Sequence, residues 1–174
     1  MSVEDRFHKF GDKHTGDNEI IFGEDEMSLS DYGYCEAFIV ENFRHRIKQP
    51  SVELISLAEA VLDTTFGDQL LWLLTTYGYV SYAGVETLSL SNRMWLNSPL
   101  IRDTMRFRQL YELPPDMIVF FKSDDNYIYC CNDLDMVYRY SLWERTLTPI
   151  HIPLEAFLVR EGIASMNRYL SHER

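Results

Sequence analysis

The side chains best suited to chemistry in this sequence are its five histidines and three cysteines, and their spacing limits what they can do. A zinc site needs His and Cys in close pairs on a turn or a helix. No histidine here lies within four residues of another histidine or of a cysteine. Asp12, His14 and Asp17 come closest to a ligand group, but they fall in a segment that we interpret as a solvated arm. The spacing therefore predicts no metal and no other cofactor.

Nucleophilic catalysis is also poorly supported by the residues. Cys130 and Cys131 are neighbours, so on a strand they point to opposite faces and can neither chelate one ion nor bridge each other. With Cys35 the number of cysteines is odd, which favours reduced thiols in a cytoplasm. No serine is flanked by the glycines that form the sharp turn of a nucleophile elbow. His151 is the one candidate base in the predicted folded part. We predict that the chain is not an enzyme, with a small hydrolase using His151 and a carboxylate as the alternative.

Two clusters of aspartates, "KSDDN" and "NDLD", could suggest a calcium loop. Such a loop needs oxygen ligands at alternate positions over about twelve residues, closed by a glutamate. Asp124, Asp125, Asp133 and Asp135 do not follow that frame. Asp and Asn also bond to their own backbone in tight turns, so these clusters predict turns.

The turns separate three short apolar or aromatic runs, "MIVFF", "YIYCC" and "VYRYS". Short strands joined by compact turns predict an antiparallel meander. Within the middle strand, alternation places Ile128 and Cys130 on one face and Tyr127 and Tyr129 on the other. The aromatic-rich stretch from Leu113 to Ser141, in which these residues lie, is therefore interpreted as a tyrosine-rich sheet.

Helices are predicted before and after this sheet. Ser51 and Asp68 are candidate N-caps, and Gly78 suits a left-handed helix stop. Pro153 suits the first turn of the last helix, and Gly162 in that helix predicts a kink or close packing. One strand is expected in "YVSYAGVETLSL". Helical spacing is found in "CEAFIVENFRHRI", "SVELISLAEAVLD", "FGDQLLWLLTTYG", "SPLIRDTMRFRQLY" and "IPLEAFLVREGIASMNRYL". The fold class is therefore α+β with an antiparallel sheet.

Charge and composition divide the chain and restrict its partners. Residues 1–34 contain "GDNEIIFGEDEMSLSD", with six acids and no base. They are predicted to form an acidic N-terminal arm, with a short added strand as the alternative. Residues 35–174 are predicted to form the globular domain. A net charge of -11 repels nucleic acid and anionic membranes and favours cationic partners, although an acidic surface also serves solubility alone. No apolar run approaches the ~18 residues of a membrane span, so we expect a cytoplasmic protein, either a monomer or a weak homodimer.

Three landmarks occur in order: "ISLAEAVLDTTFGDQLLWLLTTYGYVSYAGVETLSL", "LIRDTMRFRQLYELPPDMIVFF", and "NYIYCCN" followed by "VYRYS". This pattern resembles the SUKH superfamily over roughly residues 36–170. Where the family usually carries Leu-Pro before its second helix, this chain has Phe66-Gly67-Asp68. The residues that match the family pattern are Glu59, Tyr77, Gly78, the strand 84–90, Leu113, Pro114, Asp124, Asp125, 127–130 and Trp143.

The resemblance implies a curved antiparallel sheet packed with helices, and binding without catalysis. Many bacterial SUKH proteins are immunity proteins that bind and neutralise a cognate polymorphic toxin in bacterial competition, and many such toxins are nucleases with basic clefts. The expected partner is thus a basic protein toxin, with no nucleic acid or membrane. The alternative is a non-catalytic regulatory or scaffolding module. The candidate contacts are Asp124, Asp125, Tyr127, Asp133, Asp135 and Tyr138.

Overall fold

The computed structural model describes residues 29–45, 49–91, 97–123 and 126–172. Asp124, Asp125 and most of the predicted arm lie outside these residues. The chain divides into two compact units. The first unit comprises residues 1–43, 82–85 and 155–174, and the second comprises 44–81 and 86–154.

The second unit is built on a four-stranded antiparallel sheet with the strand order β4-β5-β6-β7. The three strands predicted from the sequence are confirmed, but a fourth was missed. Pro153 ends this fourth strand, so its placement in the last helix was wrong. Prolines are tolerated in β7 because it is an edge strand of this sheet. The strands are β4 (Ile118–Lys122), β5 (Tyr127–Cys131), β6 (Met136–Ser141) and β7 (Thr146–Pro153).

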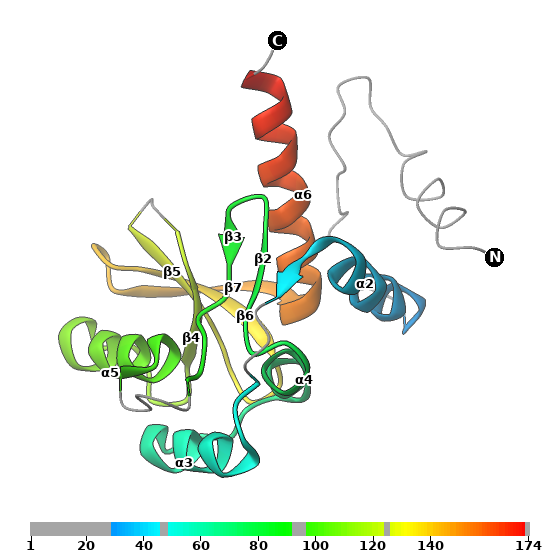
Figure 1. Cartoon of the computed structure of the whole chain (residues 1–174). Helices are drawn as coiled ribbons and strands as arrows, with labels where there is room; N and C mark the ends of the chain where they lie inside the picture. The colour runs from blue at the N-terminus through cyan, green and yellow to red at the C-terminus, as the bar shows by residue number, and fades with distance from the viewer. Residues whose placement is uncertain (1–28, 46–48, 92–96, 124–125, 173–174) are drawn as a thin grey trace. The chain divides into compact units, whose positions relative to one another are not determined.

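The alternation predicted for β5 is confirmed. Ile128 and Cys130 are buried, whereas Tyr127 and Tyr129 are half-buried. The buried face packs against α5 (Pro99–Tyr111), which contacts β4 (Figure 1). The core between them consists of Phe107, Leu113, Met117, Val119, Ile128, Cys130 and Tyr140. The α5 prediction is confirmed as well, with Pro99 at the first helical position.

Two further helices of this unit, α3 (Val52–Leu62) and α4 (Asp68–Thr76), follow the predicted pattern. Ser51 caps α3 as expected, since its hydroxyl accepts from the Leu54 N–H at 3.2 Å. Gly78 takes a φ of 68° after α4, which confirms the left-handed stop. The cap predicted for α4 was wrong, because Asp68 is the first helical residue and Gly67 occupies the N-cap position.

Arg108 joins α5 to α3 and to the start of β4. Its guanidinium donates to the carbonyl oxygen of Leu62, in the last turn of α3, at 2.5 Å. It also donates to the Met117 carbonyl oxygen at 3.0 Å. A planar guanidinium with several donors suits such a bridge between backbone carbonyls. A directed hydrogen bond therefore helps to fix α3 against α5, with which it is in contact.

A small sheet has the order β1-β2-β3, built from β1 (Arg44–His45), β2 (Val80–Tyr82) and β3 (Val85–Glu86). The prediction of a single strand over 84–90 was wrong, because two short strands, β2 and β3, lie in this region. Ala83 and Gly84 form a tight turn with φ values of 49° and 84°. Two successive positive φ values are those of the hairpin turns that match strand twist. The chain reverses at this point, so β3 covers only the first residues of the expected strand.

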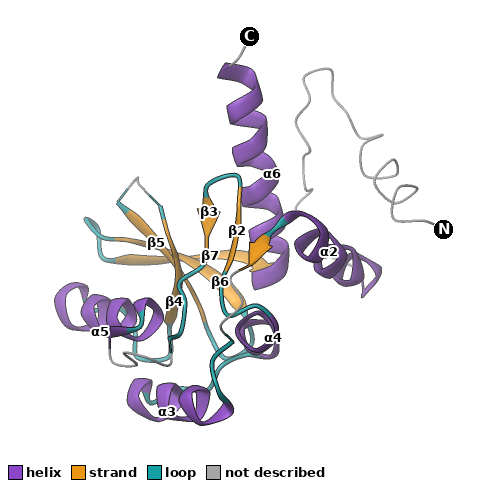
Figure 2. Ribbon diagram, in the orientation of Figure 1, coloured by secondary structure: helices purple, strands orange, loops and turns teal. Residues whose placement is uncertain are grey.

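The first unit contains α2 (Leu29–Asn42), the hairpin tip and most of α6 (Leu154–His172) (Figure 2). Tyr82 of the tip packs its ring edge-on against Phe38, with ring centres 5.7 Å apart, and lies 5.3 Å from Phe43. A Cβ on Gly162 would lie 2.6 Å from Cδ1 of Tyr82, so close packing is the reason for this glycine. The Ser165 hydroxyl donates to the Ala83 carbonyl oxygen at 2.5 Å. The predicted domain boundary after residue 34 falls within α2 and stays a prediction.

Candidate binding surface

The structure does not gather the predicted contact residues into one site. Tyr127 begins β5, whereas Asp133 and Asp135 lie in the turn that follows this strand. A strand of five residues is about 15 Å long, so these positions lie at opposite ends of the sheet. Tyr138 lies on the α5 side and packs against the core described above. Asp124 and Asp125 lie outside the described residues.

Tyr127 belongs to an aromatic area whose central charge is positive. The Arg139 guanidinium lies 4.8 Å from the centre of the Tyr127 ring, which is cation–π geometry. On the same face, the rings of Phe121 and Tyr129 are 5.5 Å apart. An exposed arginine at the centre of this area disfavours a basic partner. The other end of the sheet is better suited to a basic partner.

The turn between β5 and β6 presents an apolar and an acidic side chain to solvent. The Asn132 side-chain oxygen accepts from the backbone N–H groups of Leu134 at 3.1 Å and Met136 at 3.0 Å. These bonds close the turn and hold its tip outward. Leu134 is 74% exposed at that tip, and Asp133 is exposed beside it. An exposed leucine of this degree in an ordered turn is a candidate anchor for a partner.

Asp135 of the same turn has a structural role instead. It is only 4% exposed, and its two carboxylate oxygens accept from the N–H groups of Gln69 at 2.8 Å and Leu70 at 3.0 Å. It therefore supplies the N-terminal cap that α4 lacks locally. A Cβ on Gly67 would overlap the Asp135 carboxylate, which explains why a side chain is absent there. This geometry also accounts for the Gly67 that departs from the usual family pattern.

The carboxylates around this cap influence one another. Burial raises the pKa of Asp135, the two backbone hydrogen bonds lower it, and the charges of Asp68 and Asp133 raise it further, so that the pKa lies above 3.8. Asp68 and Asp133 are both exposed. The helix start and the neighbouring turn thus carry a concentrated negative potential at neutral pH.

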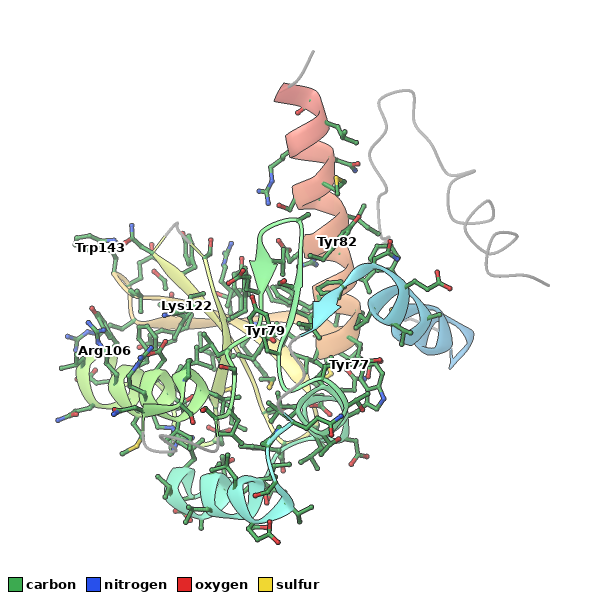
Figure 3. All side chains as sticks on the ribbon, in the orientation of Figure 1. Tyr77, Tyr79, Tyr82, Arg106, Lys122 and Trp143 are labelled. Carbon is green, nitrogen blue, oxygen red and sulfur yellow. The ribbon has the colours of Figure 1, made fainter. Side chains whose placement is uncertain are left out.

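The outer side of α4 adds aromatic side chains to this acidic area. Asp68 and Trp72 are four residues apart and lie on the same side of the helix. The Trp72 ring packs edge-on against Tyr77, with ring centres 5.4 Å apart, and both are half-buried. Tyr77 is labelled in Figure 3. We call the set Asp68, Trp72, Tyr77, Asp133 and Leu134 the α4 surface.

The sequence missed Trp72 and Leu134 as contact candidates. Trp72 lies in the run "LLWLL", where every residue suits a core, and only its spacing of four from an acid hints at exposure. Leu134 lies between two aspartates in "NDLD". An apolar residue at the centre of a turn signal is the pattern that could have revealed it.

The segment that carries most of this surface is purely acidic. Residues 49–91 contain Glu53, Glu59, Asp63, Asp68 and Glu86 but no lysine, arginine or histidine. Glu59 acts locally, because its carboxylate accepts from the Phe66 N–H at 2.8 Å. The other four acids are exposed. The negative charge of the chain is therefore locally concentrated in this segment.

The described residues offer little to a metal or to a covalent mechanism. They contain no group of three or more His, Cys, Asp or Glu placed to hold a metal ion. Burial raises the pKa of the Cys130 thiol to about 12, so it stays protonated at neutral pH. His151 is exposed on β7 with a φ of 62°. A small apolar pocket of about 10 Å³ between α4 and Phe120 has room for about one water molecule.

Comparison with known families decides what kind of domain this is. The family model SUKH_5, described as SMI1-KNR4 cell-wall, matches residues 30–151. The chain belongs to this family. The SUKH match includes α3, α4, α5 and the turn between β5 and β6, so it covers the whole α4 surface, and it ends within β7. A comparison with curated proteins found no match.

Membership confirms the resemblance drawn from the sequence and the α+β class of this SUKH domain. The family includes toxin-immunity proteins. No helix among the described residues is long and apolar enough to cross a membrane.

Proposed function

We propose that this SUKH domain is a non-catalytic immunity protein that binds a basic bacterial toxin domain in the cytoplasm and blocks it by occlusion. The contact is made by the α4 surface. The observation that carries the proposal is the combination, on one ordered helix and turn, of exposed acids with an exposed leucine and a half-buried ring pair. The family supplies the precedent, because it includes immunity proteins.

The charge of this surface suits a toxin with a basic cleft. Complementary potentials speed association by about 10- to 1,000-fold and reject partners of the wrong sign. Asp68 and Asp133 lie at the edge of the surface, where they steer an approaching partner. The acidic segment 49–91 extends the attractive field beyond the immediate contact.

The apolar groups of the surface supply the affinity. Leu134 is 74% exposed in the free protein, so a partner that covers it removes a large apolar side chain from water. Trp72 and Tyr77 already support each other edge-on, which limits the entropy lost when they are covered. Aromatic side chains held in this way are typical centres of binding energy.

The test is neutralisation of a secreted toxin domain encoded beside this gene, which the proposal requires to exist. The toxin domain is co-expressed with the wild-type protein, with Leu134→Asp and with the matched control Leu110→Asp, and growth is scored. Leu110 is also exposed, at 53%, but lies on α5. We expect growth with the wild type and the control but not with Leu134→Asp.

Binding kinetics measured on the same proteins add a second readout. Asp133→Lys should slow association with the toxin domain by about tenfold at low salt, with little change in the dissociation rate. Glu144→Lys, an exposed charge reversal of equal size at the opposite end of β6, should leave the rate unchanged. Failure of the wild type to protect cells, or equal protection by Leu134→Asp, contradicts the proposal.

The family description, which mentions the cell wall, also favours a second function. A regulatory or scaffolding module would bind several cellular proteins weakly through the same acidic surface. Affinity capture with the wild type and Leu134→Asp separates the two functions. Capture of housekeeping proteins that depends on Leu134, without toxin neutralisation, would support the scaffold.

A further inference from the structure

The outer sides of α3 and α5 carry opposite charges. The exposed side of α3 contains Val52, Glu53, Ser56 and Leu57, and Asp63 caps its C-terminus. Of these, Val52 is 72% exposed and Leu57 is 38% exposed. A helix that leaves two branched apolar residues in water beside acids has a surface suited to a basic, partly apolar partner.

The exposed side of α5 is the counterpart of this surface. Arg102, Met105, Arg106, Gln109 and Leu110 recur at helical spacing and are all exposed. Met105 is 45% exposed and Leu110 is 53% exposed. The one acid of this helix, Asp103, is buried and bonded to Arg102 and Lys122, so these three groups together keep one net positive charge, to which the exposed Arg106 adds a second. Figure 3 shows Arg106 extending outward from α5.

The two helices that carry these sides form one layer of the second unit. The helices are in contact, and Arg108 bonds the last turn of α3 to α5. A layer with one acidic and one basic helix is complementary to itself after a twofold rotation. In that arrangement α3 of each copy meets α5 of the other, so both charge pairs are satisfied at once. No other partner needs to be assumed to cover the four exposed apolar side chains of the layer.

We propose that the protein forms a weak twofold dimer through this α3–α5 layer. Helices of 11 and 13 residues give a face about 15–20 Å long and about 20 Å wide. Such a face is at or below the lower limit for stable interfaces, so the dimer belongs to the weak, transient class, and we expect a dissociation constant of about 10–100 µM. The α4 surface is not part of this layer, so the dimer goes beyond the proposed toxin binding and is independent of it.

The test is sedimentation velocity of the full chain from about 5 to 500 µM, a range that brackets the predicted constant. We expect the wild type to shift from monomer to dimer over this range, and to shift less at 0.5 M salt because exposed charges are screened. A wild type that stays monomeric at the highest concentration overturns the proposal.

Two charge-reversed proteins identify the interface. The first carries Glu53→Lys and Ser56→Lys on α3, and the second carries Arg106→Glu and Gln109→Glu on α5. All four positions are exposed, and the Arg102–Asp103–Lys122 cluster is left intact. The matched control, Glu86→Lys with Thr148→Lys, changes the net charge as much as the first protein does but lies on β3 and β7.

Each reversed protein alone should remain monomeric, while the control dimerises like the wild type. An equimolar mixture of the two reversed proteins should recover the dimer, because lysines on one α3 then face glutamates on the partner's α5, and the native pair forms on the other side. Association of either reversed protein alone, or a mixture that stays monomeric, contradicts the α3-on-α5 arrangement. Circular dichroism confirms that each variant is folded, and a variant that is not folded is replaced by Met105→Lys, which should also weaken the dimer.

Discussion

The cap of α4 by Asp135 predicts a strong, non-additive coupling between two positions that are far apart in the sequence. Replacing Asp135 with Ala removes two hydrogen bonds from a carboxylate to the N–H groups of Gln69 and Leu70. A hydrogen bond to a charged group contributes about 1.5–3 kcal/mol, and losing an N-cap costs about 0.5–2 kcal/mol. The cost of burying the charged carboxylate offsets part of this contribution. We therefore expect Asp135→Ala to lower the free energy of unfolding by about 2–4 kcal/mol.

Gly67→Ala should cost about as much by a different route. Its new methyl group would overlap the Asp135 carboxylate, so the carboxylate must move and its bonds to α4 are lost or strained. Overpacking adds about 1–3 kcal/mol. In the double variant there is no carboxylate to displace, so the second methyl group should add little. The double variant should therefore be about as stable as Asp135→Ala alone, with a coupling of about 2–3 kcal/mol.

Urea unfolding followed by tryptophan fluorescence measures all four proteins of this cycle. With a slope of about 1–3 kcal/mol per molar urea, each single variant should shift the midpoint by about 1–2 M. Additive losses, or a Gly67→Ala midpoint within about 0.3 M of the wild type, would refute the reasoning. A pH series adds an independent test. Because the folded pKa of Asp135 is raised above 3.8, the wild type should lose stability relative to Asp135→Asn as the pH rises from below 3.8 through the folded value.

Three further expectations follow from other contacts. Asp103→Asn should destabilise the fold by about 1–3 kcal/mol at pH 7 and by less at pH 3. Burial raises the pKa of Asp103, but hydrogen bonds and charges of Arg102 and Lys122 outweigh this effect and bring the pKa below 3.8. The stabilisation is therefore lost as the pH falls through that lower value. Urea titrations at both pH values would show no such difference if the ion pairs of Asp103 did not stabilise the fold. Gly162→Val should destabilise by about 1–3 kcal/mol because its side chain meets the Tyr82 ring, and a thermal midpoint equal to that of the wild type would contradict this. Every cysteine is buried, so none of the three thiols should react with a thiol reagent in the native protein, whereas all three should react in denaturant. Rapid labelling of the native protein would contradict this, because it would show that the core opens readily.

The local patterns of the sequence predicted most of the elements. Alternation around Ile128 and helical spacing after Ser51 and Pro99 are properties of neighbouring residues, and the structure confirms them. The strand β7 was missed because Pro149 and Pro153 argue against a strand unless its edge position is known. The hairpin at Ala83-Gly84 was missed because it lacks the usual asparagine or aspartate before the glycine.

The candidate site was harder to predict because it depends on contacts between distant residues. The sequence shows Asp133 and Asp135 as equivalent acids of one turn. Only the fold brings Asp135 to the N-terminus of α4 and leaves Asp133 in solvent. The proposed role of Leu134 likewise depends on the Asn132 bonds that hold the turn tip outward. The contact role of Asp133 and Tyr127 stays a prediction.

The position of β7 at the edge of the main sheet has a consequence for behaviour at high concentration. An open edge invites strands of other molecules to add to it, which is how many sheet proteins begin to form fibrils. Pro149 has no amide hydrogen, and His151 has a backbone turned to a φ of 62°, so a foreign strand cannot pair continuously along β7. Pro149, which argued against a strand in the sequence, thus also helps to keep the molecule from polymerising when it accumulates.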